Sequence, residues 1–267
     1  MKMAFATLMA LSLSAIGSPL RAGVVLTQDI VTNSGTNTTS DSRTIMIEGN
    51  KQKVVMRDQT IVLDLDGGKM ILLNPSTKTY TELPFPPRGQ MASMMQNMGG
   101  VNLDFKKTGA THTISGYKCD DYNSSGKSVM GEFSAKGCFS SAAPGAADYA
   151  GFTKQLAKKF ADAGMARTSG NQPDGVPIEL NTSTKLTNFN IPGMPPEQAE
   201  KLKAMMANRP PTTSKSTTTS IKAADLPADT FGIPPDYTER KIGMAGPGAM
   251  GAAPMAPAPG PTPYQGE

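Results

Sequence analysis

The chain contains a single histidine, His112, only two cysteines and no tryptophan. Hydrolytic triads need a histidine beside a nucleophile and an acid, and zinc sites need several imidazoles or thiolates, so most of both classes are excluded. A glycine-rich phosphate loop, a nucleophile elbow and a calcium loop are also absent from the sequence. His112 stands between Thr111 and Thr113, a pattern typical of an exposed strand position. We therefore expect a protein that is not an enzyme and that uses no cofactor and no metal.

Long apolar runs are scarce, and the one that stands out lies near the N-terminus. Lys2 precedes a mostly apolar run over residues 4–16, a Gly-Ser-Pro break follows, and Ala22 stands before Gly23. About 13 apolar positions are fewer than the roughly 20 that a membrane span needs. The pattern predicts a cleavable signal peptide over residues 1–22 and no integral membrane segment after cleavage. No cysteine follows the run, which disfavours a lipid anchor, so we expect a soluble periplasmic protein.

An excess of charge of one sign is lacking as well. The formal net charge of +4 falls further when Lys2 and Arg21 leave with the signal peptide. Lysines recur singly or in pairs, and no basic run is long enough to form a dedicated phosphate-binding patch. The composition therefore gives no reason to expect nucleic acid as a partner.

The two cysteines, Cys119 and Cys138, both lie in the exported part of the chain. In an oxidising compartment two thiols this close in sequence are most simply a disulfide, and it closes a loop of about 20 residues. A redox pair usually takes the short Cys-x-x-Cys form, which this spacing does not. We predict a structural disulfide.

Short segments rich in β-branched or alternating apolar residues are the main pattern that is present. They recur over residues 23–83 between turn signals such as Gly49-Asn50 and Asp66-Gly67-Gly68. The polar stretch 33–42 has no hydrophobic periodicity and is expected to be a loop. Strand patterns return over residues 105–135, 176–189 and 212–223, whereas residues 243–267 are rich in Gly, Ala, Pro and Met and are predicted to be a disordered tail.

Three segments show helical periodicity with an apolar face. The first covers residues 91–98, the second 149–165, and the third begins at Pro195-Pro196-Glu197 and ends near Asn208. These faces supply the candidate ligand-facing residues, namely Met91, Met94, Met95, Met98, Leu156, Phe160, Leu202 and Met205.

Methionine is abundant, with 18 residues in the chain. The stripe Met91, Met94, Met95 and Met98 has three interpretations: simple packing, an adaptable surface for an apolar ligand, and a Cu(I) site built from thioethers. Simple packing is the commonest role of such a face. The acidic pairs Asp64/Asp66 and Asp120-Asp121 are expected to be ordinary surface carboxylates.

Several short motifs, taken in order, resemble an uncharacterised bacterial exported family that is grouped with the periplasmic lipoprotein carriers, the LolA-type superfamily. The matching segments are Ile61-Val62-Leu63-Asp64, Met70-Ile71-Leu72-Leu73-Asn74-Pro75, Lys78-Thr79-Tyr80, Thr108-Gly109, Ile114-Ser115-Gly116-Tyr117-Lys118-Cys119, Tyr122, Gly175-Val176-Pro177 and Phe231-Gly232-Ile233-Pro234-Pro235-Asp236-Tyr237. The chain departs from the pattern at Asp236, where such sequences often have glycine, and in lacking a tryptophan near Glu132-Phe133.

The resemblance implies an unclosed, strongly curved antiparallel sheet with helices packed into its concave side, and it implies no catalytic residue. With the strand pattern, it predicts a mainly β (α+β) fold over residues 23–242: a single curved antiparallel half-barrel sheet of about ten strands with two or three helices on its concave side.

The leading hypothesis for function is a soluble periplasmic binding protein that holds a lipid or another apolar ligand without catalysis. One alternative is an envelope module that docks a protein or senses stress, with the tail as a spacer or partner-binding segment. The second alternative is Cu(I) handling by the methionine stripe, extended by Met244, Met250 and Met255.

Overall fold

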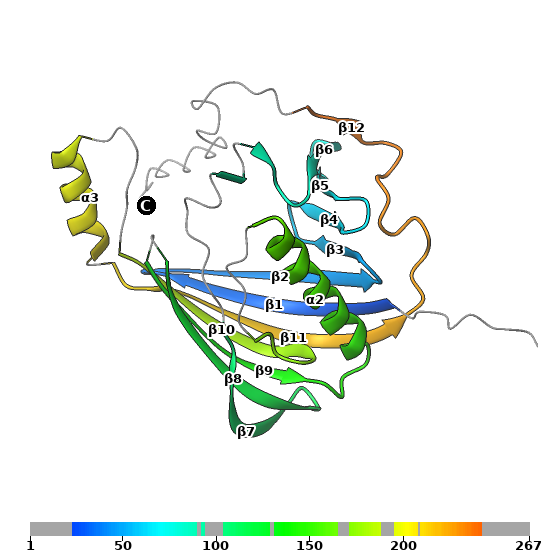
Figure 1. The fold of residues 1–267 in the computed structure, drawn as a ribbon, viewed down its shortest axis with the longest axis horizontal. Coiled ribbons are helices and arrows are strands. Elements are labelled where there is room, and N and C mark those ends of the chain that lie inside the picture. Colours follow the sequence, from blue (N-terminus) through cyan, green and yellow to red (C-terminus); the bar gives the residue numbers. More distant parts are fainter. Residues whose placement is uncertain are drawn as a thin grey trace, which may run out of the picture.

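A single twelve-stranded sheet dominates the computed structural model, which describes residues 23–89, 92–93, 104–128, 131–164, 171–187, 195–207 and 209–241. The strands lie in the order β12-β6-β5-β4-β3-β2-β1-β11-β10-β9-β8-β7 (Figure 1). Their bounds are β1 Gly23–Ser34, β2 Asn37–Glu48, β3 Lys51–Val55, β4 Thr60–Asp64, β5 Lys69–Asn74, β6 Thr79–Pro84, β7 Lys106–Ile114, β8 Tyr117–Ser128, β9 Gly131–Ser140, β10 Val176–Leu186, β11 Thr212–Ala224 and β12 Thr238–Glu239. Neighbouring strands pair antiparallel, except that β12 pairs with β6 in parallel.

The mainly β, curved, open sheet predicted from the sequence is confirmed, but the number of strands is higher than the predicted ten or so. Residues 33–42, which were expected to form a loop, lengthen β1 and β2 without adding a strand. Most of this stretch extends β2, which pairs with β1 as far as Ser34 and Asn37. Its side chains are exposed, so it carries no hydrophobic alternation, and the ladder with β1 and threonine's preference for strands hold it extended.

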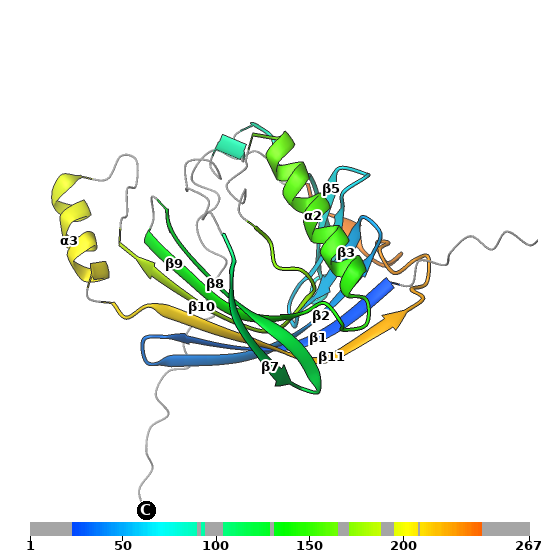
Figure 2. The ribbon, with the colours of Figure 1, turned by 60° about the horizontal axis from the view of Figure 1, so that its bottom comes forward.

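Two helices are described in full, α2 (Ala146–Asp162) and α3 (Pro196–Ala207). Two or three helices were predicted on the concave side of the sheet. Of the two described helices only α2 lies there, because α3 extends beyond the ends of β10 and β11 (Figures 1 and 2). Neither described helix combines the length and the apolar character that crossing a membrane requires.

Helix α2 lies inside the curve of the sheet (Figure 2), and one apolar face holds it there. Phe152 is 1% exposed and belongs to the same core cluster as Val24 and Leu26 of β1. Burying a side chain of this size contributes about 1.5–3 kcal/mol. The helix approaches β1 closely because it is preceded by Gly145, whose φ is 69° and where an added Cβ would lie 2.5 Å from Cβ of Val24.

The alternation of residues along β1 defines the two faces of the sheet. Val24, Leu26 and Gln28 are buried on the face that carries α2, which we call the helix face. The residues between them point to the opposite face, which we call the outer face. Because paired residues on neighbouring strands point to the same side, the registers extend both assignments across the sheet.

The segment after β11 covers the outer face of β4 to β6. Phe231, Ile233 and Tyr237 pack there against a cluster of Val62, Ile71 and Leu73. Val62 is 1% exposed, because this segment, which is distant in sequence, covers the outer face of β4.

Two lysines of the sheet bind the segment that follows β11. Lys53 Nζ donates to the Thr230 carbonyl at 2.8 Å, and Lys78 Nζ lies 2.8 Å from Asp236 Oδ2. The hydrogen bond from Lys78 lowers the pKa of Asp236.

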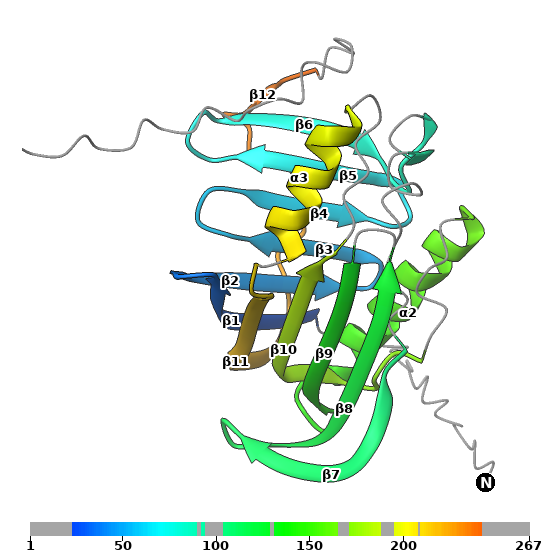
Figure 3. The ribbon, with the colours of Figure 1, turned by 90° about the vertical axis from the view of Figure 1, so that its left-hand side faces the viewer.

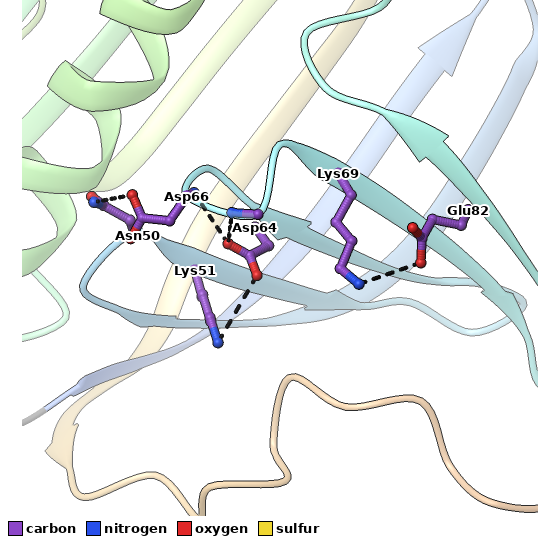
Figure 4. Close-up of polar contacts among 7 residues, drawn as sticks. Asn50, Lys51, Asp64, Asp66, Lys69 and Glu82 are labelled. Atoms are coloured by element: carbon purple, nitrogen blue, oxygen red, sulfur yellow. Dashed lines mark hydrogen bonds and ion pairs between the residues drawn. The ribbon is translucent and has the colours of Figure 1, made fainter.

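The turn between β4 and β5 explains the acidic pair Asp64/Asp66 (Figure 4). Asp64 Oδ1 accepts hydrogen bonds from the backbone N–H groups of Asp66 and Gly67, at 3.1 and 2.7 Å. Asn50 Nδ2 donates to Asp66 Oδ1 at 3.0 Å, which joins this turn to the one before β3. Both carboxylates therefore stabilise turns, a more specific role than the ordinary surface carboxylates that the sequence predicted.

The predicted disulfide is confirmed. Cys119 of β8 and Cys138 of β9 are bonded, with their Cα atoms 5.3 Å apart. Both are buried within the main core cluster.

The first testable consequence concerns this disulfide. Replacing both cysteines with serine should lower the free energy of unfolding by about 3 kcal/mol, because the unfolded chain regains the freedom of a loop of about 20 residues. Urea unfolding of the variant and of the oxidised wild type measures the difference, and the reduced wild type is the control. Equal stability of oxidised and reduced wild type would contradict the prediction.

The second testable consequence concerns the turn between β4 and β5 (Figure 4). Asp64→Ala removes the acceptor of two backbone hydrogen bonds and should cost about 1–2 kcal/mol of stability, whereas Asp64→Asn keeps an acceptor and should cost less. Thermal unfolding ranks the two variants. Equal losses in the two variants would show that the charge of Asp64, and not its role as an acceptor in the turn, is what stabilises the fold.

Candidate functional site

The candidate ligand-facing residues from the sequence fall into three groups. Met91, Met94, Met95 and Met98 lie outside the described residues, so the three interpretations of the stripe stay open. Leu156 and Phe160 of α2 pack against the main core, and the Phe160 ring meets Phe85 edge-to-face with centroids 5.1 Å apart. Leu202 and Met205 lie on α3, where Met205 is 67% exposed. The described candidates do not come together into one site.

A different apolar surface lies on the helix face of β8 to β10. Phe105, Ala135 and Phe139 are buried there, and the partly buried residues packed against them are Tyr122, Phe133 and Leu180. The ring centroids of Phe139 lie 5.7 Å from Phe105 and 5.5 Å from Tyr122, both edge-to-face. We call these six residues the aromatic wall.

The strand registers place the aromatic wall on the same side of the sheet as α2. Ile30 of β1 pairs with Ser216, Ser216 with Leu180, and Leu180 with Gly137. Gly137 pairs in turn with Tyr122. Ile30 lies two residues after Gln28 and therefore points to the same face of β1, so this row lies on the helix face throughout. The wall is nonetheless a separate cluster from the one that contains the residues of α2.

Two buried hydroxyl groups lie beside the aromatic wall without partners. Ser216 pairs across the strands with Leu180, and Ser124 pairs with Ala135. The two serines are 8% and 6% exposed, and neither side-chain oxygen has a hydrogen-bond partner in the described structure. An unsatisfied buried hydroxyl costs about 1–3 kcal/mol, which a bound polar group would recover.

The buried side chains of Gln28 and Thr218, by contrast, are satisfied, whereas a third buried hydroxyl, that of Ser140, has no partner in the described structure. Gln28 Nε2 donates to Thr218 Oγ1 at 2.9 Å, and Arg43 Nε donates to Gln28 Oε1 at 2.9 Å. Thr218 Oγ1 donates to the Pro177 carbonyl at 2.6 Å. Burial raises the pKa of Tyr149 while the positive charge of Arg43 opposes it, so the phenol stays neutral. These hydrogen bonds link β1, β2, β10 and β11 to one another.

His112 gives no support for a metal site. Its Nδ1 lies 2.9 Å from Asp121 Oδ2, and its side chain is 57% exposed, as the sequence predicted. Cys138 is the third potential ligand near them, but its sulfur is committed to the disulfide. Two ligands on a strand surface do not hold zinc, which takes three or four. The neighbouring carboxylate of Asp120 pairs with Lys107 at 2.8 Å.

On the outer face, Glu179 is bound by two neighbours. Lys215 Nζ lies 2.8 Å from Glu179 Oε2, and Asn181 Nδ2 donates to Glu179 Oε1 at 2.8 Å. Partial burial works to raise the pKa of Glu179, but these hydrogen bonds favour the ionised form and bring the pKa below its ordinary value.

The family to which the chain belongs is shown by a model that matches residues 36–191, more than half of the chain. The chain is a member of the family described as a domain of unknown function (DUF4412). This confirms the resemblance to an uncharacterised family that the sequence motifs indicated. No curated protein matches the chain.

Solved structures similar to this chain share few of its residues. A putative outer membrane lipoprotein-sorting protein domain from Vibrio parahaemolyticus is 7% identical, with a TM-score of 0.32 over 79% of this chain and 89% of that one. A LolA superfamily protein from Nitrosomonas europaea is 14% identical, with a TM-score of 0.29 over 79% and 90%. PNGF-II is 9% identical with a TM-score of 0.38; the match covers 83% of this chain but only 31% of PNGF-II.

Sequence reasoning missed the aromatic wall, although one signal for it was present. Phe133, Ala135, Gly137 and Phe139 alternate along β9, the period expected of one strand face. The remaining members come from β8, β10 and the segment before β7, and only the pairing of these elements brings them together.

The geometry around Glu179 makes stability depend on pH. A carboxylate whose pKa is lower in the folded state stabilises the fold above its unfolded-state pKa, and this contribution is lost as pH falls through the folded-state pKa. Glu179→Gln should therefore be less stable than wild type at neutral pH, and the difference should shrink in acid. Urea unfolding across a pH series tests this, with Glu239→Gln, an exposed carboxylate, as control. A difference that is constant with pH would contradict the assignment.

Proposed function

We propose that the protein is a non-catalytic binding protein of the bacterial periplasm that holds an acyl chain or another elongated apolar ligand against the aromatic wall. The observation that supports this most is a second apolar surface on the helix face that is distinct from the core under α2. Phe133, Tyr122 and Leu180 remain partly accessible along it. Aromatic and aliphatic groups with a few polar atoms are the usual lining of sites for apolar ligands.

The orphaned hydroxyls give the ligand a polar end. Ser124 and Ser216 flank the wall on β8 and β11, and each can donate one hydrogen bond to a carboxyl or ester oxygen. A fatty acid or acyl ester therefore suits the surface better than a plain hydrocarbon does.

The absence of catalysis is part of the proposal. In the described residues, the carboxylates weighed in the sequence are engaged in turns or ion pairs, and His112 pairs with Asp121 on an exposed strand. The periplasmic location rests on the signal-like residues 1–22 and on a disulfide, which persists in an oxidising compartment.

A fluorescent long-chain fatty acid provides the direct test. Wild type should bind it, and Leu180→Ala and Phe133→Ala should each weaken binding by about tenfold, because each removes apolar contact area. Val31→Ala, an exposed apolar residue of β1 on the outer face, is the matched control and should bind like wild type.

Native mass spectrometry of protein extracted gently from the periplasm should show a co-purifying lipid that is displaced by the same probe. Absence of both a bound lipid and probe binding, or an equal loss in the Val31 variant, would refute the proposal.

A further inference from the structure

The outer face of β1, β11, β10 and β9 carries a polar hollow of about 420 Å³. Two rows of paired residues cross it. Lys215 pairs with Asn181, and Asn181 pairs with Lys136. The second row runs from Asn33 through Thr213 and Ser183 to Ser134. The volume lies within the range of roughly 300–1,000 Å³ that is usual for small-molecule sites.

These rows point away from the aromatic wall. Asn181 follows Leu180 and Lys136 precedes Gly137, so each alternates with a residue of the helix-face row. The hollow is therefore separate from the site of the proposed function.

The charge of the hollow is one-sided. Lys136 and Lys215 are its only charged lining residues, and no carboxylate is among the described residues that line it. Lys215 is neutralised by Glu179 at 2.8 Å. Lys136 makes no ion pair with any carboxylate in the part of the chain that the structure describes, so its ammonium group is available to an anion.

The remaining lining is rich in hydrogen-bonding groups. Asn33 and Asn181 supply amides that both donate and accept, and the other lining residues are serines and threonines. No apolar side chain lines the hollow, which argues against an acyl chain. No arginine lines it either, although arginine's planar fork is the usual means of binding a phosphate in two places.

The hollow continues beside β8. An adjoining hollow of about 270 Å³ shares Lys136 and Asn181. Its lining also includes Asn123, His112, the carboxylates of Asp121 and Glu179, and Tyr122 of the aromatic wall. The polar surface thus extends across several strands, which suits a chain of linked hydroxyl-bearing units better than a single small ion.

We propose that this outer-face hollow binds an acidic carbohydrate, with Lys136 pairing with a sugar carboxylate while the amides and hydroxyls of β1, β9, β10 and β11 bind sugar hydroxyls. The charge-assisted bond from Lys136 supplies the preference for an acidic sugar over a neutral one. The amides and hydroxyls supply the preference for a sugar acid over a plain carboxylate.

The test is an amide-resolved NMR titration of the full chain with D-glucuronate, D-glucose, acetate and inorganic phosphate. Glucuronate should shift the amides of Lys136, Asn181 and Ser183 and bind more tightly than the other three. Lys136→Met should weaken glucuronate binding by about tenfold, the value of one charge-assisted hydrogen bond, and Lys136→Arg should restore most of it. Lys222→Met, an exposed lysine elsewhere on β11, is the control and should bind like wild type.

Three results would overturn the proposal: no shifts with glucuronate, equal shifts with phosphate alone, or an unchanged affinity in Lys136→Met. Fatty-acid binding by Lys136→Met should equal that of wild type. Its loss would show that the two faces are not separate sites, so failure here and failure of the proposed function are distinguishable.

Discussion

The pairing of β1 with strands on both sides is the constraint on which the rest of the structure depends. On one side β1 pairs with β2, its neighbour in sequence, and on the other with β11, so that Leu26 lies opposite Ile221. Without β1 the sheet would divide into two parts, β12 with β6 to β2 and β11 to β7. Pairing β1 with β11 closes a loop made of all the chain between them, and the entropic cost of closing a loop grows only with the logarithm of its length. The hydrogen bonds of the long ladder and the burial of Leu26 and Ile221 offset this cost. The hydrogen bond from Gln28 to Thr218 lies where the register between the two strands shifts.

The register of β1 also decides which chemistry each face has. Its even-numbered residues point to the helix face, and its odd-numbered residues point to the outer face. A slip by one residue would move Val24 and Leu26 to the outer face and remove them from the core on which α2 packs. Gly145 strengthens this specification, since the close approach of α2 is made to Val24 in particular. The position of α2 in turn leaves the wall around Phe139 as a cluster of its own.

Sequence patterns predicted the parts of the fold that depend on local order. The alternation of Ile61, Leu63 and Leu65 indicated a strand, and the spacing of Cys119 and Cys138 indicated the disulfide. Local pattern failed where distant segments decide the outcome. Val62 is buried by a segment that begins after β11, and α3 has an apolar pattern but stands beyond the strand ends.

The candidate site was less predictable than the fold for the same reason. Leu156 and Phe160 have the spacing of an apolar helix face, and that face packs on the core. Phe105, Tyr122 and Leu180 lie far apart in sequence and show no common period, so only the order of strands β8, β9 and β10 unites them. The same order assembles Lys136, Asn181 and Lys215 on the other face. Periodicity identifies the face of one element, whereas a site on a sheet is a row across several.

The position of the disulfide follows from this arrangement. Strands β2 to β6 are joined by short turns and covered by the C-terminal segment and α2, whereas β8 has only the edge strand β7 beyond it (Figure 3). The bond from Cys119 to Cys138 ties β8 to β9 next to this edge of the sheet. Tyr122 follows Cys119 by three residues and Phe139 follows Cys138 directly, and their rings meet edge-to-face at 5.5 Å. The disulfide therefore adds a covalent link between the two strands that supply most of the aromatic wall.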